Sequence, residues 1–174
     1  TYASLQVGVK NNDTTHSLTL KDSARLYCLQ DSDSPASSSV SGLELFNNAP
    51  LVLQDNSYLE AKGKPSSGEY VGCGIATNSS IRVTDNAEIK AAAQSVAIDA
   101  GGAVTISGGK VTANSTGSNG IYSGKTIAIS NGATVEAAGY LPALFAQSGV
   151  EISSSRVDAS ASNDVAIFSR STVN

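Results

Sequence analysis

The feature that most limits how this chain can fold is a repeat of 23 residues. Short apolar triplets recur along the sequence, and from Ile81 onward they begin every 23 residues. The triplets begin at Leu18, Leu51, Ile81, Val104, Ile127, Val150 and Val173. A constant interval of this length predicts a repeat architecture, in which each unit packs against the units before and after it.

Each repeat contains two further apolar segments, and their alternation predicts strands with one buried face. In the second segment, a large apolar residue is followed two positions later by a small one. These pairs are Leu26/Cys28, Leu59/Ala61, Ile89/Ala91, Val111/Ala113, Val135/Ala137 and Val157/Ala159. The third segment is centred on an aliphatic residue, at Leu45, Ile75, Ile98, Ile121, Leu144 and Ile167.

Turn-forming residues separate the first two segments, as in Thr84-Asp85-Asn86 and Ser130-Asn131-Gly132. Such residues tolerate a left-handed backbone or cap it with their side chains. Three strands and three corners per repeat are typical of one rung of a parallel β-helix. The leucine-rich pattern is not found, and the uneven spacing does not match a left-handed hexapeptide helix. We therefore expect an all-β chain that forms a right-handed, single-stranded parallel β-helix (a β-solenoid).

The repeat also predicts how the chain is organised. We expect residues 1–15 to form an N-terminal cap, because Leu5, Val7 and Val9 alternate outside the phase of the repeat. Residues 16–174 then hold six full rungs and the start of a seventh. The corners at about 29–42 and 62–73 carry insertions. Loops on a rigid scaffold often bind ligands, although two tolerated surface loops are the plainer interpretation.

Composition indicates the setting in which the protein works. Charged residues make up 15% of the chain and aromatic residues 5%, which is typical of secreted β-rich repeat proteins. We therefore expect an extracellular or cell-surface location. The net charge of −4 without a basic cluster argues against nucleic acid as a partner. No apolar stretch approaches the roughly 18 residues of a spanning helix, so we expect no membrane span in this chain.

The two ends lead to expectations about neighbouring sequence and partners. The chain begins at Thr1 and contains no methionine, so we expect that upstream sequence has been removed. The phase of Ser171-Thr172-Val173 matches that of Ser148-Gly149-Val150, so we expect the repeat to continue after Asn174. An uncapped rung exposes unpaired backbone groups, which predicts some end-to-end self-association.

The titratable residues do not suggest a catalytic centre. His16 is the sole histidine, and no metal-spaced Cys/His set, G-x-S-x-G motif or phosphate-binding glycine loop is found. We therefore predict that the chain is not an enzyme and needs no cofactor. In adjacent rungs, Glu136 and Asp158 fall on the same outward column, which predicts either a weak calcium site or a solvated acidic spot.

Aromatic residues give the main candidate for ligand binding. The position after the third-segment aliphatic residue faces outward, and three consecutive rungs place an aromatic residue there. This outward column reads Phe46, Ala76, Asp99, Tyr122, Phe145 and Phe168. A ladder of Tyr122, Phe145 and Phe168 is a candidate surface for sugar rings or a protein partner, and cross-strand stabilisation is the alternative.

The two cysteines border the same corner. Cys28 ends the second segment of the first rung, and Cys73 closes the inserted corner of the next. One interpretation is a disulfide, which suits an extracellular protein. The other is that Cys28 is a small buried apolar residue at a position where alanine is otherwise found.

Two phrases of the repeat resemble a known family. Residues 104–113 (VTISGGKVTA) and 129–137 (ISNGATVEA) are similar to repeats of secreted or cell-surface bacterial β-helix proteins in the pectate-lyase-like superfamily. The resemblance covers residues 16–174 and is specific for fold more than for activity. It implies contact with polysaccharides, either by lyases and hydrolases or by non-catalytic binding modules, some of which use calcium.

This chain departs from the enzymes of that family. From residue 79 to 174 the corners are minimal, and no cluster of Asp or Glu with Arg or Lys is found on the outward columns. We therefore expect a non-catalytic extracellular module that acts as a stalk, an adhesion module or a polysaccharide-binding domain. The alternative is a fragment of a carbohydrate-active enzyme whose catalytic rungs lie beyond Asn174.

Overall fold

The described part of the chain is built entirely from parallel strands. The computed structural model describes residues 2–7, 16–29, 40–63 and 72–174. These residues form eighteen strands and no helix, and every strand pairing among them is parallel. None of the described residues forms a helix that is long and apolar enough to cross a membrane.

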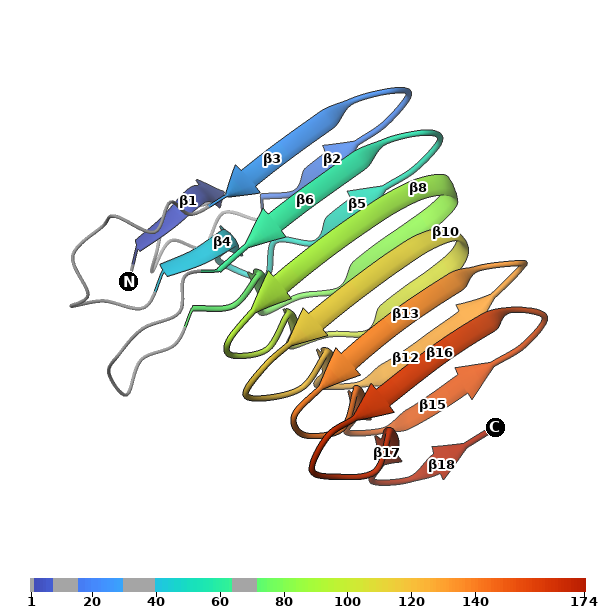
Figure 1. Cartoon of the computed structure of the whole chain (residues 1–174). Helices are drawn as coiled ribbons and strands as arrows, with labels where there is room; N and C mark the ends of the chain where they lie inside the picture. The colour runs from blue at the N-terminus through green and yellow to red at the C-terminus, as the bar shows by residue number, and fades with distance from the viewer. Residues whose placement is uncertain (1, 8–15, 30–39, 64–71) are drawn as a thin grey trace.

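The strands fall into three columns, each of which receives one strand or part of a strand from every repeat (Figure 1). The first column contains β2 (Leu18–Leu20), β5 (Leu51–Leu53), the first parts of β8 (Ile81–Ala93) and β10 (Val104–Ser115), β12 (Thr126–Ser130), β15 (Gly149–Ile152) and β18 (Thr172–Val173). The second column contains β3 (Arg25–Leu29), β6 (Tyr58–Lys62), the second parts of β8 and β10, β13 (Thr134–Gly139) and β16 (Arg156–Ala161). The third column contains β1 (Tyr2–Val7), β4 (Val40–Leu45), β7 (Ile75–Thr77), β9 (Ile98–Ala100), β11 (Ile121–Ser123), β14 (Leu144–Ala146) and β17 (Ile167–Ser169).

Register in the first two columns follows the predicted repeat. Val104 of β10 lies opposite Ile81 of β8 and Ile127 of β12. In the second column, Val111 lies opposite Ile89 and Val135. Each strand therefore pairs with its equivalent in the next repeat, and the predicted phase of these two columns is confirmed.

The predicted third column is wrong in its first member. Ile75 pairs with Leu43, and Leu45 lies opposite Thr77. The corner after β4 is two residues longer than the later ones, because eight residues separate Leu43 from Leu51 whereas six separate Ile75 from Ile81. Asn47 and Asn48 in this corner both have a positive φ, of 55° and 56°. The outward residue of β4 is consequently Glu44 and not Phe46.

Strand β1 extends the third column at the N-terminal end. It pairs in parallel with β4, so that Leu5 lies opposite Leu43 and Val7 opposite Leu45. Tyr2–Val7 therefore forms a strand that stacks on β4, and the N-terminal cap at residues 1–15 stays a prediction. Residue Val9 and most of both inserted corners lie outside the described residues.

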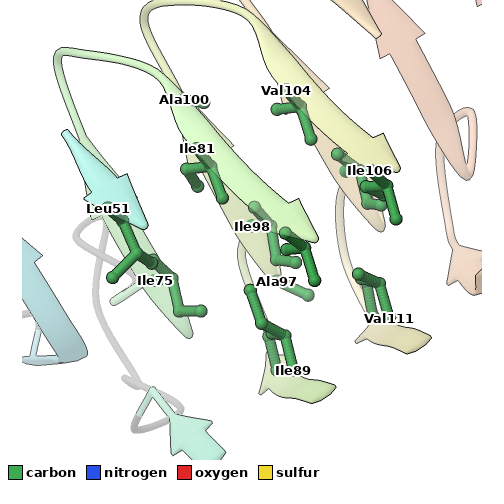
Figure 2. Packing of buried hydrophobic residues seen from close by; sticks show 14 of the residues in the cluster. Leu51, Ile75, Ile81, Ile89, Ala97, Ile98, Ala100, Val104, Ile106 and Val111 are labelled. Carbon is green, nitrogen blue, oxygen red and sulfur yellow. The ribbon is translucent and has the colours of Figure 1, made fainter. Parts of the chain in front are cut away.

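The inward residues of all three columns form one hydrophobic cluster. Figure 2 shows successive members of the first column, Leu51, Ile81 and Val104, following one another from repeat to repeat. Ile89, Ile98 and Ile106 are at most 1% exposed. Burying an aliphatic side chain of this size contributes about 1.5–3 kcal/mol, and this core holds the repeats together.

The corners between the first and second columns take up left-handed backbone, as predicted. Asp55, Asp85 and Asn131 have φ values of 60°, 60° and 57°, and Gly108 has a φ of 79°. The aspartates also join successive repeats, because the Asp55 carboxylate accepts a hydrogen bond from the Asp22 N–H at 3.0 Å. The short polar side chains of these corners therefore serve both the turn and the stacking.

Candidate functional site

The predicted aromatic ladder forms on the outward face of the third column. Tyr122 of β11 lies opposite Phe145 of β14, which lies opposite Phe168 of β17. The ring centroids of Tyr122 and Phe145 are 5.3 Å apart with an interplanar angle of 12°, and those of Phe145 and Phe168 are 5.2 Å apart with an angle of 20°.

The distances between the ring centroids indicate which part of each ring is exposed. Two coplanar rings at 5.2 Å would bring their edge carbons closer than the roughly 3.5–4.0 Å that non-bonded carbons keep. The nearly parallel rings are therefore stacked on one another and do not lie side by side in one plane. Because each ring covers part of the next, the ladder presents mostly ring edges to its surroundings. This geometry favours the interpretation that the rings stabilise adjacent repeats over the interpretation that they form a platform for sugars.

The remaining outward positions of the third column are acidic or small. They are Glu44, Ala76 and Asp99. Burial raises the pKa of the Asp99 carboxyl, and one carboxylate oxygen of Glu44 is buried with no hydrogen-bond partner among the described residues. This end of the third column therefore differs in chemistry from the aromatic end.

Both cysteines are free thiols in this structure. Both cysteines lie beside Gly42. The Gly42 N–H donates to the Cys73 carbonyl at 3.0 Å, and a Cβ added to Gly42 would lie 2.8 Å from the Cys28 carbonyl oxygen. Burial, followed by the charge of Asp99, raises the pKa of the Cys73 thiol to about 12. The disulfide between Cys28 and Cys73 stays a prediction.

The predicted acidic pair is closely placed but separately neutralised. Glu136 lies opposite Asp158 in adjacent strands. The ammonium of Lys110 is 3.1 Å from Glu136, and the guanidinium of Arg156 is 2.8 Å from Asp158. No group of three or more metal-ligating side chains is found among the described residues. Because Glu136 and Asp158 are each paired with a cation, the arrangement favours a solvated ion-pair network over a calcium site.

A hollow that the sequence did not suggest lies on the outward face of the second column. It has a volume of about 400 Å³. Its lining residues are Lys62, Gly63, Ala92, Ala93, Gln94, Asn114 and Thr116. A smaller hollow of about 140 Å³ adjoins it and shares Lys62, Ala92 and Asn114. We call these two together the second-column hollow.

Register explains why the surface sinks here. Lys62 of β6, Ala92 of β8 and Asn114 of β10 lie opposite one another in three consecutive repeats. Ala92 has only a methyl side chain, and longer side chains stand on either side of it. Among the described residues, neither the Lys62 ammonium nor the Asn114 amide makes a side-chain hydrogen bond or ion pair. The hollow therefore combines a small apolar floor with unpaired polar groups.

A polar network forms one border of the second-column hollow. The Tyr58 hydroxyl donates to a Glu60 carboxylate oxygen at 2.7 Å. Lys90 lies opposite Glu60 in register, yet its ammonium pairs with Glu88 at 3.6 Å and lies 5.4 Å from the centre of the Tyr58 ring. Among the described residues, Glu60 and Lys90 therefore already have side-chain partners, whereas the Lys62 ammonium has none.

Such a hollow can be recognised from the sequence only when the register between neighbouring strands is known. The signal is a small residue between two long polar ones in equivalent positions, here Lys62, Ala92 and Asn114. The aligned pairs Leu59/Ala61, Ile89/Ala91 and Val111/Ala113 give this equivalence, so the signal could have been found in the sequence.

Comparison of the chain with family models, with curated proteins and with solved structures gives no match. The fold and the surface features above therefore define a class only: an all-β protein of parallel strands that repeat in register.

Proposed function

We propose that this chain is a right-handed parallel β-helix that serves as a rigid, non-catalytic module of an extracellular or cell-surface protein. The observation that carries the proposal is the unbroken register of the first column, which runs in phase from Leu18 to Val173. Each repeat packs on the next through backbone hydrogen bonds and a shared core, so each adds about 4.8 Å to one stiff body. A stiff, extended body suits a stalk or an adhesion module.

The alternation of the columns along the chain supports the winding. In every repeat, a first-column strand is followed by a second-column strand and then by a third-column strand. A chain that returns to the same column each time, always in parallel, has to wind in one direction. Crossover connections between parallel strands of one sheet are overwhelmingly right-handed.

Two measurements test the proposal. Hydrogen exchange is expected to be slow throughout residues 81–152, and rapid exchange inside this range would contradict a rigid module. Incubation with acidic and neutral polysaccharides is expected to give neither ultraviolet-absorbing unsaturated ends nor new reducing ends. Either product would favour the alternative, a fragment of a carbohydrate-active enzyme.

Polysaccharide binding is a second candidate function, and the second-column hollow favours it over the aromatic ladder. The hollow offers amide and ammonium groups that have no side-chain partner in the described part of the chain, whereas the rings of the ladder are stacked on one another. An affinity-gel screen, run with and without calcium, tests this candidate directly.

We also propose that copies of this chain associate end to end. β16 pairs with β13 on one side only, and Val173 and Phe168 are 55% and 40% exposed. An open strand edge next to exposed apolar side chains favours pairing with another chain. Light scattering at increasing concentration is expected to show oligomers, and a strict monomer would contradict this proposal.

A further inference from the structure

We propose that Asn131 is the site at which the folded chain is spontaneously modified, by deamidation through ring closure with the backbone nitrogen of Gly132. The chain contains two Asn-Gly pairs, Asn119-Gly120 and Asn131-Gly132. Both pairs have a favourable sequence for this reaction, because a glycine carries no side chain that would shield its nitrogen. The structure separates them, since only the second lies in a turn from which the ring can form. The modification does not depend on the rigid-module role proposed above.

The reaction is a loss of ammonia followed by an uptake of water. Hydroxide removes the proton of the Gly132 N–H, and the nitrogen attacks the side-chain Cγ of Asn131. A new C–N bond forms as the bond to the side-chain amide nitrogen breaks, and that nitrogen takes a proton from water and leaves as ammonia. Water then opens the five-membered succinimide at either carbonyl, which gives aspartate or its β-linked isomer. Every atom comes from the two residues and water, so the reaction requires no enzyme.

The corner that holds Asn131 is a tight turn that lies close to the reactive conformation. The φ values of Asn131 and Gly132 are 57° and 75°, and the Ala133 N–H donates to the Ser130 carbonyl at 3.2 Å. Two positive φ values inside such a hydrogen bond are typical of a type I′ turn. Rotation of the central peptide alone converts it into a type II′ turn, in which ψ of the first central residue is about −120°. At that ψ the Gly132 nitrogen eclipses the Asn131 Cβ, as a five-membered ring requires.

Two hydrogen bonds oppose this rotation, and both lie at the surface. The Gly132 N–H donates to the Ser154 carbonyl at 2.7 Å, and the Asn131 side chain donates from Nδ2 to the Ser107 hydroxyl at 2.7 Å. Asn131 and Gly132 are both exposed, and a Cβ built on Gly132 would meet no atom within 4 Å. Breaking these two bonds leaves the core intact, so it costs far less free energy than unfolding a repeat.

Asn119-Gly120 is closed to the same reaction while the chain is folded. Asn119 is 7% exposed, and its Nδ2 donates to the Pro142 carbonyl at 2.8 Å. The Asn119 carbonyl accepts the Ala97 N–H at 3.1 Å, which joins two successive repeats. A Cβ built on Gly120 would lie 2.8 Å from the Ala143 carbonyl oxygen, so a ring at this place has no space. This pair therefore reacts only after the repeats separate.

The aspartate product suits the corner. The equivalent residue of earlier repeats is Asp22, Asp55 or Asp85, with φ values of 57°, 60° and 60°. The Asp85 carboxylate accepts the Asp55 N–H at 3.3 Å. An aspartate at position 131 can accept the Gly108 N–H in the same way, because Gly108 is its equivalent in the preceding repeat. The β-linked isomer instead adds a carbon to the backbone of the corner.

Peptide mapping by mass spectrometry tests the proposal on the full chain. The folded protein, and the same protein in concentrated urea, are incubated at mildly alkaline pH in heavy-oxygen water, which labels each new carboxylate. Ser107→Ala removes the acceptor of the Asn131 side chain. Ser148→Ala is the matched control, because Ser148 is an exposed serine in a different corner. Asn131→Asp, examined by circular dichroism, reports whether the product keeps the fold.

In the folded chain we expect Asn131 to deamidate at least about tenfold faster than Asn119, and in urea we expect similar rates at both. Ser107→Ala should raise the folded-state rate at Asn131 several-fold, Ser148→Ala should leave it unchanged, and Asn131→Asp should keep the spectrum of the unaltered chain. Equal rates in the folded chain, a faster reaction at Asn119, or no product at Asn131 once the urea sample is fully converted would each overturn the proposal. Equal effects of the two serine variants would contradict the local opening of this corner.

Discussion

Gln147 donates a hydrogen bond from its side-chain Nε2 to the hydroxyl oxygen of Tyr122 in the preceding repeat, over 2.9 Å. The contact anchors the polar tip of the first ring in the aromatic stack. It also holds that ring in a fixed position against Phe145, from which the next ring follows.

Substitutions in the stack separate its hydrogen bond from its ring contacts. Phe145→Ala removes both ring pairs and part of the apolar contact, so it should lower the free energy of unfolding by about 2–3 kcal/mol. Tyr122→Phe keeps the rings and loses one hydrogen bond, so its cost should be about 0.5–1.5 kcal/mol. Urea unfolding measures both. If Phe145→Ala instead abolishes glycan binding without loss of stability, the ladder is a ligand platform after all.

Core residues at equivalent positions should contribute different amounts to the free energy of unfolding, depending on the repeat in which they lie. Ile121→Ala removes a fully buried side chain and should cost about 2–5 kcal/mol. Ile167 occupies the same column at the end of the stack and is only partly buried, so Ile167→Ala should cost less. Denaturant unfolding of the two variants checks this order, and a larger loss for Ile167→Ala would contradict the position of the core.

Two corner glycines test backbone strain against close contact. Both have a positive φ, 79° for Gly108 and 75° for Gly132. A Cβ at Gly108 would lie 2.7 Å from the Asp85 carbonyl oxygen, whereas one at Gly132 would meet nothing within 4 Å. Gly132→Ala should therefore cost about 1–2 kcal/mol, from left-handed strain alone, and Gly108→Ala should cost more. Equal losses of unfolding free energy would contradict the crowded contact at Gly108.

Calcium should leave the protein unchanged. Glu136 and Asp158 already pair with Lys110 and Arg156, so neither EDTA nor added calcium is expected to shift the thermal unfolding midpoint. Glu136→Gln should change the unfolding free energy by about 1 kcal/mol or less, because the ion pair is half-exposed. A calcium-dependent rise in the midpoint that disappears in Glu136→Gln would establish the metal site instead.

Alkaline pH should destabilise the folded state through Cys73. Its folded pKa of about 12 lies above the usual value of 9.0, so the unfolded chain releases the thiol proton first. Stability is therefore full below pH 9 and falls as the pH rises toward 12. Between pH 9 and 10 the loss should be about 1 kcal/mol for this thiol.

Unfolding under reducing conditions measures that loss. Burial also raises the pKa of Cys28, so the decisive control is a double variant with alanine at both positions. This variant should lose most of the slope between pH 9 and 10. An unchanged slope would show that the thiols do not cause it.

The sequence predicts two columns well because their pattern is local. In Ile127-Ala128-Ile129, alternation alone identifies the inward face, and the constant interval then sets the pairing. The third column fails at Leu45 because two left-handed asparagines lengthen the corner that follows. Strand β1 escapes the pattern because the residues between it and β2 do not keep the interval.

The surface features depend on side-chain torsions and cross-strand contacts, which the 23-residue repeat does not determine. The order of Tyr122, Phe145 and Phe168 follows from the repeat, but the overlap of their rings depends on side-chain torsions. The second-column hollow depends on the contrast between Ala92 and its neighbours across strands, which appears only when three repeats are aligned. The ion pairs of Glu136 and Asp158 depend on Lys110 and Arg156, which approach them from other positions on the same face.

Because the interval between equivalent residues is constant from Ile81 to Val173, the molecule can change its length by whole repeats. Duplicating or deleting a segment such as residues 104–126 joins equivalent positions, because Val104 and Ile127 occupy the same place in successive repeats. The inner columns stay continuous, and the molecule changes by about 4.8 Å in reach. A cut of another size within a strand would displace the following residues of that repeat from their columns, whereas the longer repeats that begin at Leu18 and Leu51 keep the register. A gene of this design can therefore vary reach in fixed steps by unequal recombination while keeping each end surface intact.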